Sequence, residues 1–313
     1  MNILITGATG MIGQALVSHL SKQHQLTLLG RTHEKITQLF SNRYAILTWD
    51  DLNSHSEDQL KNIDIIVNLA GENIGEKRWS YDQKQKILNS RVTATKAISE
   101  LCASLGENAP RILNAGGVGI YGFSKESDPA NTYFTEKSTI SMNPDCFLTT
   151  VGNAWENALS FAEKNNVKTV KMRFGVVLSN QGGALQKMLP AFRFGLGAVL
   201  GNGKQPFSWV VLDDLVRAID FIISKPDITG AVNIVSPGVT TQGDFAKSLA
   251  RSLHRPCFLR MPESIVRLLF GEMGNELLLK GQRVKSEQLL QMGFQFQYTQ
   301  IDQALQFLFM GKK

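Results

Sequence analysis

A glycine-rich segment close to the start of the chain has the spacing of a phosphate-binding turn. Residues 6–13 read Thr-Gly-Ala-Thr-Gly-Met-Ile-Gly, after a short apolar run and at the start of an amphipathic stretch. Gly7 permits a tight exit from a strand, Gly10 lets the backbone approach a pyrophosphate, and Gly13 lets a helix pack on the strand. The start of that helix offers free N–H groups and a positive dipole end to phosphate. The segment predicts a dinucleotide site with contacts at Gly7, Thr9, Gly10, Met11, Ile12 and Gly13.

The residue that follows the second predicted strand indicates which dinucleotide binds. An Asp or Glu at this point holds the ribose 2′-hydroxyl of NAD, whereas a cation suits the 2′-phosphate of NADP. The chain reads Leu28-Leu29-Gly30-Arg31 here, so a guanidinium stands in place of an acid. A guanidinium binds phosphate through two parallel hydrogen bonds. Arg31 therefore favours NADP(H) over NAD(H); the alternative is a surface cation near the start of a helix.

Further cofactor contacts are predicted where other strands end, because the carboxyl ends of parallel strands meet at one edge of a sheet. Asp50 ends the third predicted strand, 45–49, where a contact with adenine is expected. Small residues follow the fourth, 63–69, and would let the cofactor pass. The predicted contacts beyond the glycine-rich turn are Asp50, Leu69, Ala70, Gly71, Asn114, Ala115 and Gly175.

Short apolar runs alternate with helical patterns as far as about residue 178, which is typical of an α/β protein with a Rossmann-type, doubly wound parallel sheet. Predicted strands lie at 2–5, 25–29, 45–49, 63–69, 111–115, 167–172 and 231–235, and predicted helices at 11–22, 80–105, 153–165, 185–194, 213–224, 240–253, 262–270, 285–291 and 300–309. We expect a dinucleotide-binding domain over 1–178, partly completed by 205–235. The remainder, 179–313, is expected to form a small α-rich C-terminal domain that binds substrate.

Composition excludes several other classes of protein. With 313 residues, 43% hydrophobic and 19% charged, the chain is of the globular type. Its three cysteines and five histidines are widely spaced, so no disulfide framework and no metal site is predicted. No apolar run is long enough to span a membrane, and no membrane partner is expected. The start of the chain reads as a strand, which predicts a cytoplasmic protein.

The net charge of +6 is concentrated near the end of the chain, where residues 251–313 hold nine Lys and Arg against five Asp and Glu. Such an excess indicates either a surface that attracts phosphorylated molecules or a solvated basic surface. No short basic cluster and no nucleic-acid-binding module is present, so no nucleic-acid partner is expected.

Taken together, the motifs resemble the extended short-chain dehydrogenases/reductases, and more narrowly an atypical, NAD(P)-dependent epimerase-like branch. The motifs are TGxxGxxG at 6–13, Asn68-Leu69-Ala70-Gly71, Arg78-Trp79-Ser80, Asn89-Ser90-Arg91, Tyr121-Gly122, Trp155-Glu156, Gly182-Gly183-Ala184-Leu185 and Ser208-Trp209-Val210. Residues 268–273 and 281–284 are similar to the small C-terminal domain of that branch, of the DUF1731 type. The resemblance covers essentially the whole chain and implies a Rossmann-type, NADP-binding oxidoreductase or epimerase.

The resemblance also implies a catalytic Tyr and Lys in YxxxK and a Ser after the fifth strand, and this chain departs from that pattern. The anchors Asn143-Pro144-Asp145 and Glu156 put the Tyr position at Leu148 and the Lys position at Gly152, and the Ser position falls on Gly116. None of these can move or tune a proton. The residues that could substitute are Tyr121, Thr149, Thr150, Cys146, Glu72 and Glu136. Tyr121 is the first candidate; the alternative is that it only packs against a loop.

The predicted substrate contacts are the aromatic and charged side chains that would line a cleft: Glu72, Arg78, Trp79, Lys204 and Trp209. For both tryptophans, core packing is the alternative. One hypothesis is an enzyme that acts on a nucleotide-sugar or another small carbonyl molecule. The other is a non-catalytic NADP(H)-binding sensor or regulatory partner, which the resemblance links to cell division. A monomer and a homodimer built on 80–105 and 153–165 are both compatible with the sequence.

Overall fold

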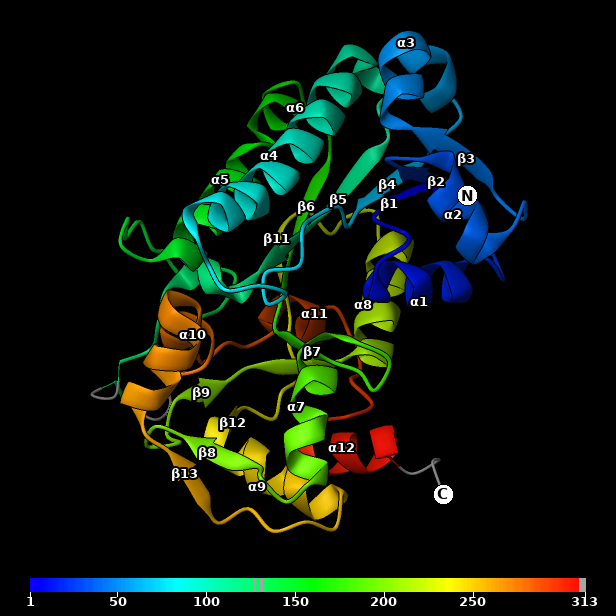
Figure 1. The fold of residues 1–313 in the computed structure, drawn as a ribbon. Helices are drawn as coiled ribbons and strands as arrows, with labels where there is room; N and C mark the ends of the chain where they lie inside the picture. The colour runs from blue at the N-terminus through cyan, green and yellow to red at the C-terminus, as the bar shows by residue number, and fades with distance from the viewer. Residues whose placement is uncertain (126–127, 130–131, 310–313) are drawn as a thin grey trace.

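The computed structural model describes residues 1–125, 128–129 and 132–309, with the side chains of 53–58 excepted. Its centre is a seven-stranded, fully parallel sheet in the order β11-β6-β5-β4-β1-β2-β3. The strands are β1 (Asn2–Thr6), β2 (Gln25–Gly30), β3 (Ala45–Thr48), β4 (Ile65–Asn68), β5 (Arg111–Gly117), β6 (Thr169–Phe174) and β11 (Gly230–Ile234). The strand order reverses between β1 and β4 (Figure 1). In open sheets of this kind, ligands bind at the carboxyl ends of the strands beside such a reversal. The predicted doubly wound parallel sheet is confirmed.

Helices cover both faces of the sheet because consecutive strand residues point to opposite sides. Ile3 and Ile5 of β1 belong to a core with α1 (Met11–Leu20), α2 (His33–Phe40) and α8 (Leu212–Ser224). Leu4 between them belongs to a second core, with α3 (Trp49–Leu60), α4 (Tyr81–Ser104) and α6 (Ser160–Lys164). Short 3-10 helices, η1 (Gly106–Asn108) and η2 (Val118–Tyr121), flank β5, and α5 (Phe147–Asn157) packs on η2.

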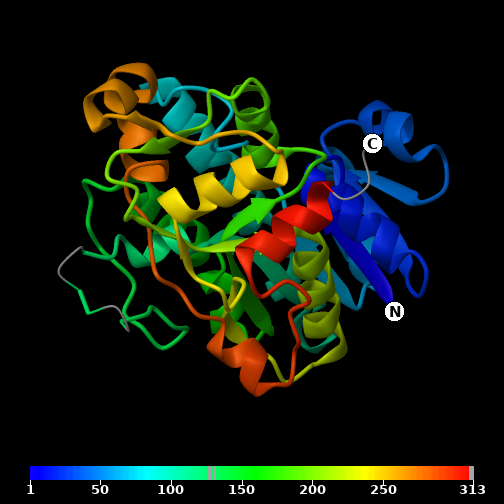
Figure 2. The same ribbon diagram turned by 90° about the horizontal axis from the view of Figure 1, so that it is seen from below.

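A second lobe lies below the carboxyl edge of the sheet in Figure 1. Its strands form three pairs: β7 (Val176–Leu178) with β10 (Trp209–Val211), β8 (Ala198–Leu200) with β13 (Leu259–Met261), and β9 (Pro206–Phe207) with β12 (Thr240–Thr241). Its helices are α7 (Gly183–Arg193), α9 (Gln242–Ser252), α10 (Glu263–Leu277) and α12 (Ile301–Phe309), while α11 (Glu287–Gln291) packs on β11. Figure 2 shows α9 and α12 side by side, over a core that includes Trp209 and Phe245.

The chain returns to the first lobe after residue 211. Within 205–235, α8 and β11 complete the sheet and its helical cover, but β9 and β10 pair inside the second lobe. The helix predicted at 153–165 is two helices, and the first begins at Phe147. Among the described helices, none is long and apolar enough to cross a membrane.

Candidate functional site

The glycine-rich turn lies at the point where the strand order reverses, between β1 and α1. Gly7 has φ +67°, and a Cβ built on it would lie 2.6 Å from the carbonyl oxygen of Leu69 at the end of β4. A Cβ on Gly13 would lie 2.3 Å from the Gly7 oxygen and 2.6 Å from Ala8 Cα. Both distances are far below van der Waals contact, so only glycine fits either position without a backbone shift. The close approach expected from the spacing is therefore present.

The N-terminus of α1 is left open. Within this fully described segment, no side chain caps the helix at Gly10 and its first turn carries no acid. On the other side, Gly182 and Gly183, which precede and begin α7, pack against the Met11 side chain. The helix start therefore lies between the two lobes with its N–H groups unclaimed by a protein carboxylate. That arrangement suits a phosphate.

Arg31 follows β2 at the surface, immediately before Thr32, the N-cap of α2. Among the described residues, no carboxylate forms an ion pair with its guanidinium.

Asp50, the predicted adenine contact, does not end the third strand as expected. β3 ends at Thr48, and Asp50 lies exposed in the first turn of α3. The helix starts early because Asp51 accepts hydrogen bonds from the N–H and hydroxyl of Thr48, both at 2.7 Å.

A buried network of polar side chains supports the carboxyl edge of the sheet, at the ends of β1 and β4. Asn68 donates to Asn114 Oδ1 at 2.6 Å and to Thr95 at 2.9 Å, and it accepts from the Thr6 hydroxyl at 2.6 Å. Thr6 Oγ1 in turn accepts the N–H groups of Leu69 and Ala70, at 3.1 Å each. The network fixes the backbone beside which a cofactor would pass. The Asn114 side chain is buried in this network and supports the edge, and its predicted contact with the cofactor stays a prediction.

The remaining predicted cofactor contacts divide into accessible and buried positions. Thr9 and Gly71 are exposed, and Met11, Ile12, Leu69 and Ala70 are half-buried near the turn. Ala115 is buried in β5, and a Cβ on Gly175 would lie 2.9 Å from the carbonyl oxygen of Ser208. Gly175 therefore allows the second lobe to approach the end of β6, and no part of it is free for a ligand.

Tyr121 is locked inside the protein and does not line a cleft. Its side chain is 3% exposed; its hydroxyl accepts from Arg173 Nη1 at 2.7 Å and donates to Asn233 Oδ1 at 2.8 Å. Arg173 is held by a two-point ion pair with Glu156, at 2.7 and 2.8 Å. Burial raises the pKa of Tyr121, although the Arg173 charge opposes the rise. The prediction that Tyr121 contacts substrate is wrong for this structure, because burial and both hydrogen bonds commit the phenol to joining η2, β6 and β11.

Helix α5 presents apolar groups at the positions that the family pattern gives to Tyr and Lys. Leu148 is half-buried and packs close to Gly119 of η2. A Cβ on Gly152 would lie 2.9 Å from Cβ of Ile120, so the helix meets η2 too closely for a side chain there. A Cβ on Gly116 would lie 3.3 Å from the Met172 oxygen.

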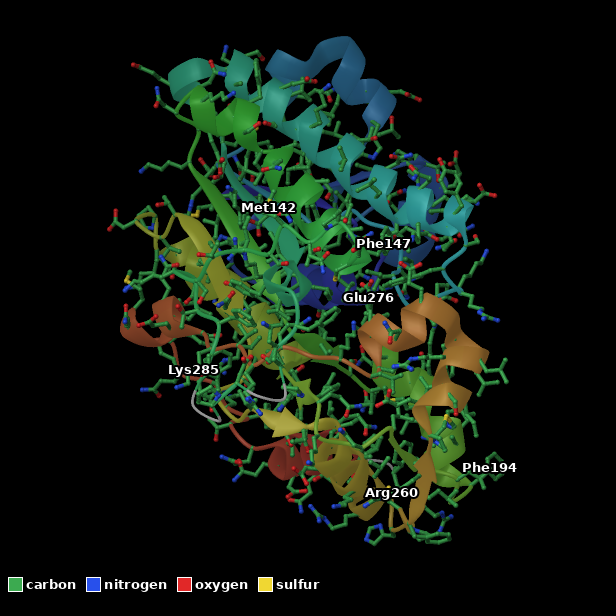
Figure 3. The ribbon with its side chains drawn as sticks, turned by 90° about the vertical axis from the view of Figure 1, so that its left-hand side faces the viewer. Met142, Phe147, Phe194, Arg260, Glu276 and Lys285 are labelled. Carbon is green, nitrogen blue, oxygen red and sulfur yellow. The ribbon has the colours of Figure 1, made fainter. Side chains whose placement is uncertain are left out.

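The N-terminus of α5 is filled by a carboxylate from the second lobe, which the sequence did not reveal. Glu276 of α10 accepts the N–H groups of Phe147 at 2.9 Å and Leu148 at 3.0 Å, and the thiol of Cys146 at 3.4 Å. Figure 3 shows Glu276 beside Phe147, where α10 meets α5. Burial raises the pKa of Cys146, and the Glu276 charge adds to the rise.

Two of the predicted substrate contacts are core residues. Trp209 is fully buried and donates to the Gly238 oxygen at 2.9 Å, so it cannot wall a cleft. Trp79 is nearly buried, with its ring 4.8 Å from that of Phe147 and its N–H bound to the Ile74 oxygen. Trp209 begins β10 and packs with α7, α9 and α12, while Trp79 packs with α5. For both tryptophans the core-packing alternative is correct.

The charged substrate candidates lie apart from one another. Arg78 is exposed at the junction of the lobes, where a Cβ on Gly271 of α10 would lie 3.2 Å from its guanidinium. The carbonyl of Glu72 accepts from Arg91, a buried guanidinium whose pKa burial lowers to about 10. Lys204 is exposed between β8 and β9 in the second lobe. The structure therefore brings Glu72 and Arg78 to the sheet edge and leaves Lys204 on the far lobe.

Arg283 is a site candidate that the sequence analysis did not single out. Its Nη1 is buried and lacks a hydrogen-bond partner among the described residues. Its backbone is fixed against the chain that follows η2, because its N–H donates to Ser124 and its carbonyl accepts from the N–H of Phe134. A half-buried, unpaired cation here is suited to an anionic ligand. The segment 281–284 resembled the C-terminal domain, but nothing in the pattern marked Arg283 as unpaired.

Among the described residues, no group of three or more His, Cys, Asp or Glu side chains is placed to hold a metal ion.

Comparisons with known proteins agree with the geometry. Residues 3–235 match the NAD dependent epimerase/dehydratase family, and residues 261–308 match a domain of unknown function, DUF1731. The epimerase family protein Mb2239 of Mycobacterium bovis is 35% identical over 309 residues, which cover 97% of this chain and 96% of the relative.

Two solved structures share the architecture. The human epimerase family protein SDR39U1 (isoform 2), crystallised with NADPH, is 29% identical with a TM-score of 0.87, over 99% of this chain and 100% of that one. A nucleoside-diphosphate sugar epimerase from Corynebacterium glutamicum is 28% identical with a TM-score of 0.76, over 99% of this chain and 58% of that longer chain. The match extends through both lobes. This chain therefore belongs to the NAD dependent epimerase/dehydratase family.

Proposed function

We propose that the protein binds NADP(H) at the glycine-rich turn and acts as an oxidoreductase or epimerase-like enzyme on a nucleotide-sugar or another small carbonyl compound. The observation that carries the proposal is the open N-terminus of α1. The turn before it packs so closely at Gly7 and Gly13 that a Cβ at either position would collide with backbone. These residues fit a pyrophosphate. When bound, the nicotinamide would supply or accept a hydride.

The choice of NADP(H) rests on Arg31. Its guanidinium is exposed at the end of β2, next to the expected ribose, and can hold a 2′-phosphate through two hydrogen bonds. The human relative crystallised with NADPH supports the same choice.

The chain's own contribution to a reaction would be positioning and electrostatics. Leu148, Gly152 and Gly116 stand where we infer that relatives place the triad, and Tyr121 is buried, so proton transfer by these groups is not part of the proposal. Arg283 would hold an anionic part of the substrate beside Ser124, in the chain that follows η2. Orientation of this kind can supply a large share of a rate enhancement.

The second candidate is a non-catalytic NADP(H) sensor or regulatory protein. The observation that favours it is the tight contact of Gly152 with Ile120, which leaves no room for a side chain at the position of the family's Lys. In that case the cofactor would change the contact between the lobes without being consumed.

Calorimetric titration of the purified protein with NADPH and NADH tests the cofactor assignment. We expect NADPH to bind roughly tenfold more tightly, and Arg31→Ala to remove that factor, about 1.4 kcal/mol, without changing NADH affinity. Arg43→Ala, an exposed cation beyond the far end of α2, is the matched control and should have no effect. Equal affinity for both dinucleotides in the wild type would contradict the assignment.

Nicotinamide absorbance with a panel of nucleotide-sugars then separates the two candidates. Consumption of cofactor that Arg283→Ala reduces, while NADPH affinity is unchanged, supports the enzyme. An epimerase returns its cofactor, so the sugar products are analysed as well. Tight binding with neither cofactor consumption nor any change in the sugar across the panel supports the sensor.

A further inference from the structure

The second lobe exposes an apolar and basic surface far from the glycine-rich turn. Phe194 is 82% exposed, Phe258 75% and Leu196 62%. Arg193, Arg255 and Arg260 are exposed beside them. We call these six residues the β8–β13 patch. Figure 3 shows Phe194 projecting from the edge of this lobe, with Arg260 on the same lobe.

Strand pairing makes the patch continuous although its two segments lie about sixty residues apart in the chain. β8 and β13 run parallel, with Leu259 opposite Ala198 and Arg260 opposite Val199. Upstream, Arg255 Nε donates to the Arg193 oxygen at 2.7 Å. The aromatic and basic side chains of both segments are therefore held on neighbouring backbones.

The patch is positive because carboxylates are absent from both segments that build it. The sequence has no Asp or Glu between Lys164 and Leu212, and none between Phe245 and Pro262. The next acid, Glu263, is paired with Arg267 at 2.8 Å. Part of the basic excess of residues 251–313 therefore lies in this patch, at Arg255 and Arg260.

Apolar side chains that project into water, flanked by arginines, fit an anionic lipid surface. The rings can enter the headgroup region while the guanidiniums bind lipid phosphates. A nucleic acid would use the rings for stacking, but Leu196 offers no flat face and gains only by leaving water. We propose that the β8–β13 patch is a peripheral docking surface for a bilayer that contains acidic phospholipid. The expectation of no membrane partner rested on the lack of a spanning segment, which does not bear on peripheral contact.

Co-sedimentation of the full chain with lipid vesicles tests the proposal. We expect retention on vesicles of equal phosphatidylcholine and phosphatidylglycerol, little on phosphatidylcholine alone, and release at high salt. Phe194→Ser with Phe258→Ser should reduce the partition coefficient by at least roughly tenfold. Arg193→Glu with Arg260→Glu should reduce it by roughly fivefold for each unit of charge changed.

The matched control is Phe161→Ser with Lys164→Glu, which removes an exposed ring and a cation from α6, at the opposite end of the molecule (Figure 1). It should leave partitioning unchanged. Because all these side chains are exposed, each variant should keep the melting temperature of the wild type.

Three outcomes would overturn the proposal: equal retention on both kinds of vesicle, loss in the α6 control that matches loss in the patch variants, or retention that the patch variants do not change. Binding of an oligonucleotide in place of vesicles would assign the patch to nucleic acid. A dimer by light scattering that Phe194→Ser with Phe258→Ser converts to monomer would assign it to a second copy of the chain. NADPH titration is independent of every arm, so failure here leaves the cofactor assignment intact.

Discussion

Two helices begin at the carboxyl edge of the same sheet, and their first turns are treated in opposite ways. The start of α1 has no side-chain cap and no acid in its first turn, and it lies between the lobes. The start of α5 is covered by Glu276, which accepts two backbone N–H groups and a thiol. A helix N-terminus attracts negative charge wherever it lies. The first therefore remains available to a phosphate, and the second is neutralised by the protein's own carboxylate.

The glycines of the two helices sharpen the contrast. Gly13 of α1 lets the helix press on the turn that would hold the cofactor, whereas Gly152 of α5 lets the helix press on Ile120. The same lack of a Cβ lets a helix approach the predicted cofactor turn in one place and closes the position of the family's Lys in the other.

The largest effect is expected from Gly13→Ala. The new Cβ would overlap backbone at 2.3 Å, so we expect a loss of about 1–3 kcal/mol of unfolding free energy and at least roughly tenfold in NADPH affinity. Gly117→Ala in β5 is the control, because its extended backbone is open and its Cβ would meet no described atom within 4 Å. Urea unfolding should place the control within about 0.5 kcal/mol of the wild type. Equal costs for the two variants would show that the close packing at the turn carries no special strain.

Glu276→Gln should have the next largest effect, on stability alone. Because the substitution removes the charge of the cap, we expect the free energy of unfolding to fall by about 1–3 kcal/mol. NADPH affinity should stay within twofold of the wild type. Glu272→Gln on the same helix breaks only an exposed ion pair with Lys84 at 2.9 Å and should cost less than about 1 kcal/mol. Denaturant unfolding and calorimetry measure both. A large fall in NADPH affinity on Glu276→Gln would mean that the two helix ends are coupled.

The smallest effect concerns the acidity of Cys146, the N-cap of α5. Burial and then the Glu276 charge hold its thiol pKa above the ordinary value, so thiolate forms only at high pH. Glu276→Gln should lower that pKa, because the helix N–H groups would then face the sulfur without a competing negative charge. Thiolate absorbance against pH, in a variant with Cys102 and Cys257 replaced by alanine, measures it. An unchanged or higher midpoint would show that Glu276 does not govern this helix end.

The features predicted from the sequence are those encoded over a few neighbouring residues. The glycine spacing, the apolar strands and their alternation with helices each report a local conformation, and the order of elements then restricts the sheet to a few topologies. The same reasoning failed for Asp50, whose helix begins early through a contact with Thr48. It failed also for Trp79 and Trp209, which pack against segments distant in the chain. Local polarity gives poor warning of burial when the covering segment is distant.

By itself, the sequence determined the glycine-rich turn and its place at the end of the first strand, because both depend on a local pattern with glycines three residues apart. Only the tertiary structure decided the fate of Tyr121, whose partner Asn233 lies 112 residues away, and of the α5 N-terminus, capped from 129 residues away. The patch made by β8 and β13 is of the same kind. Contacts at such separations depend on which faces pack together, and no short pattern in the chain encodes them.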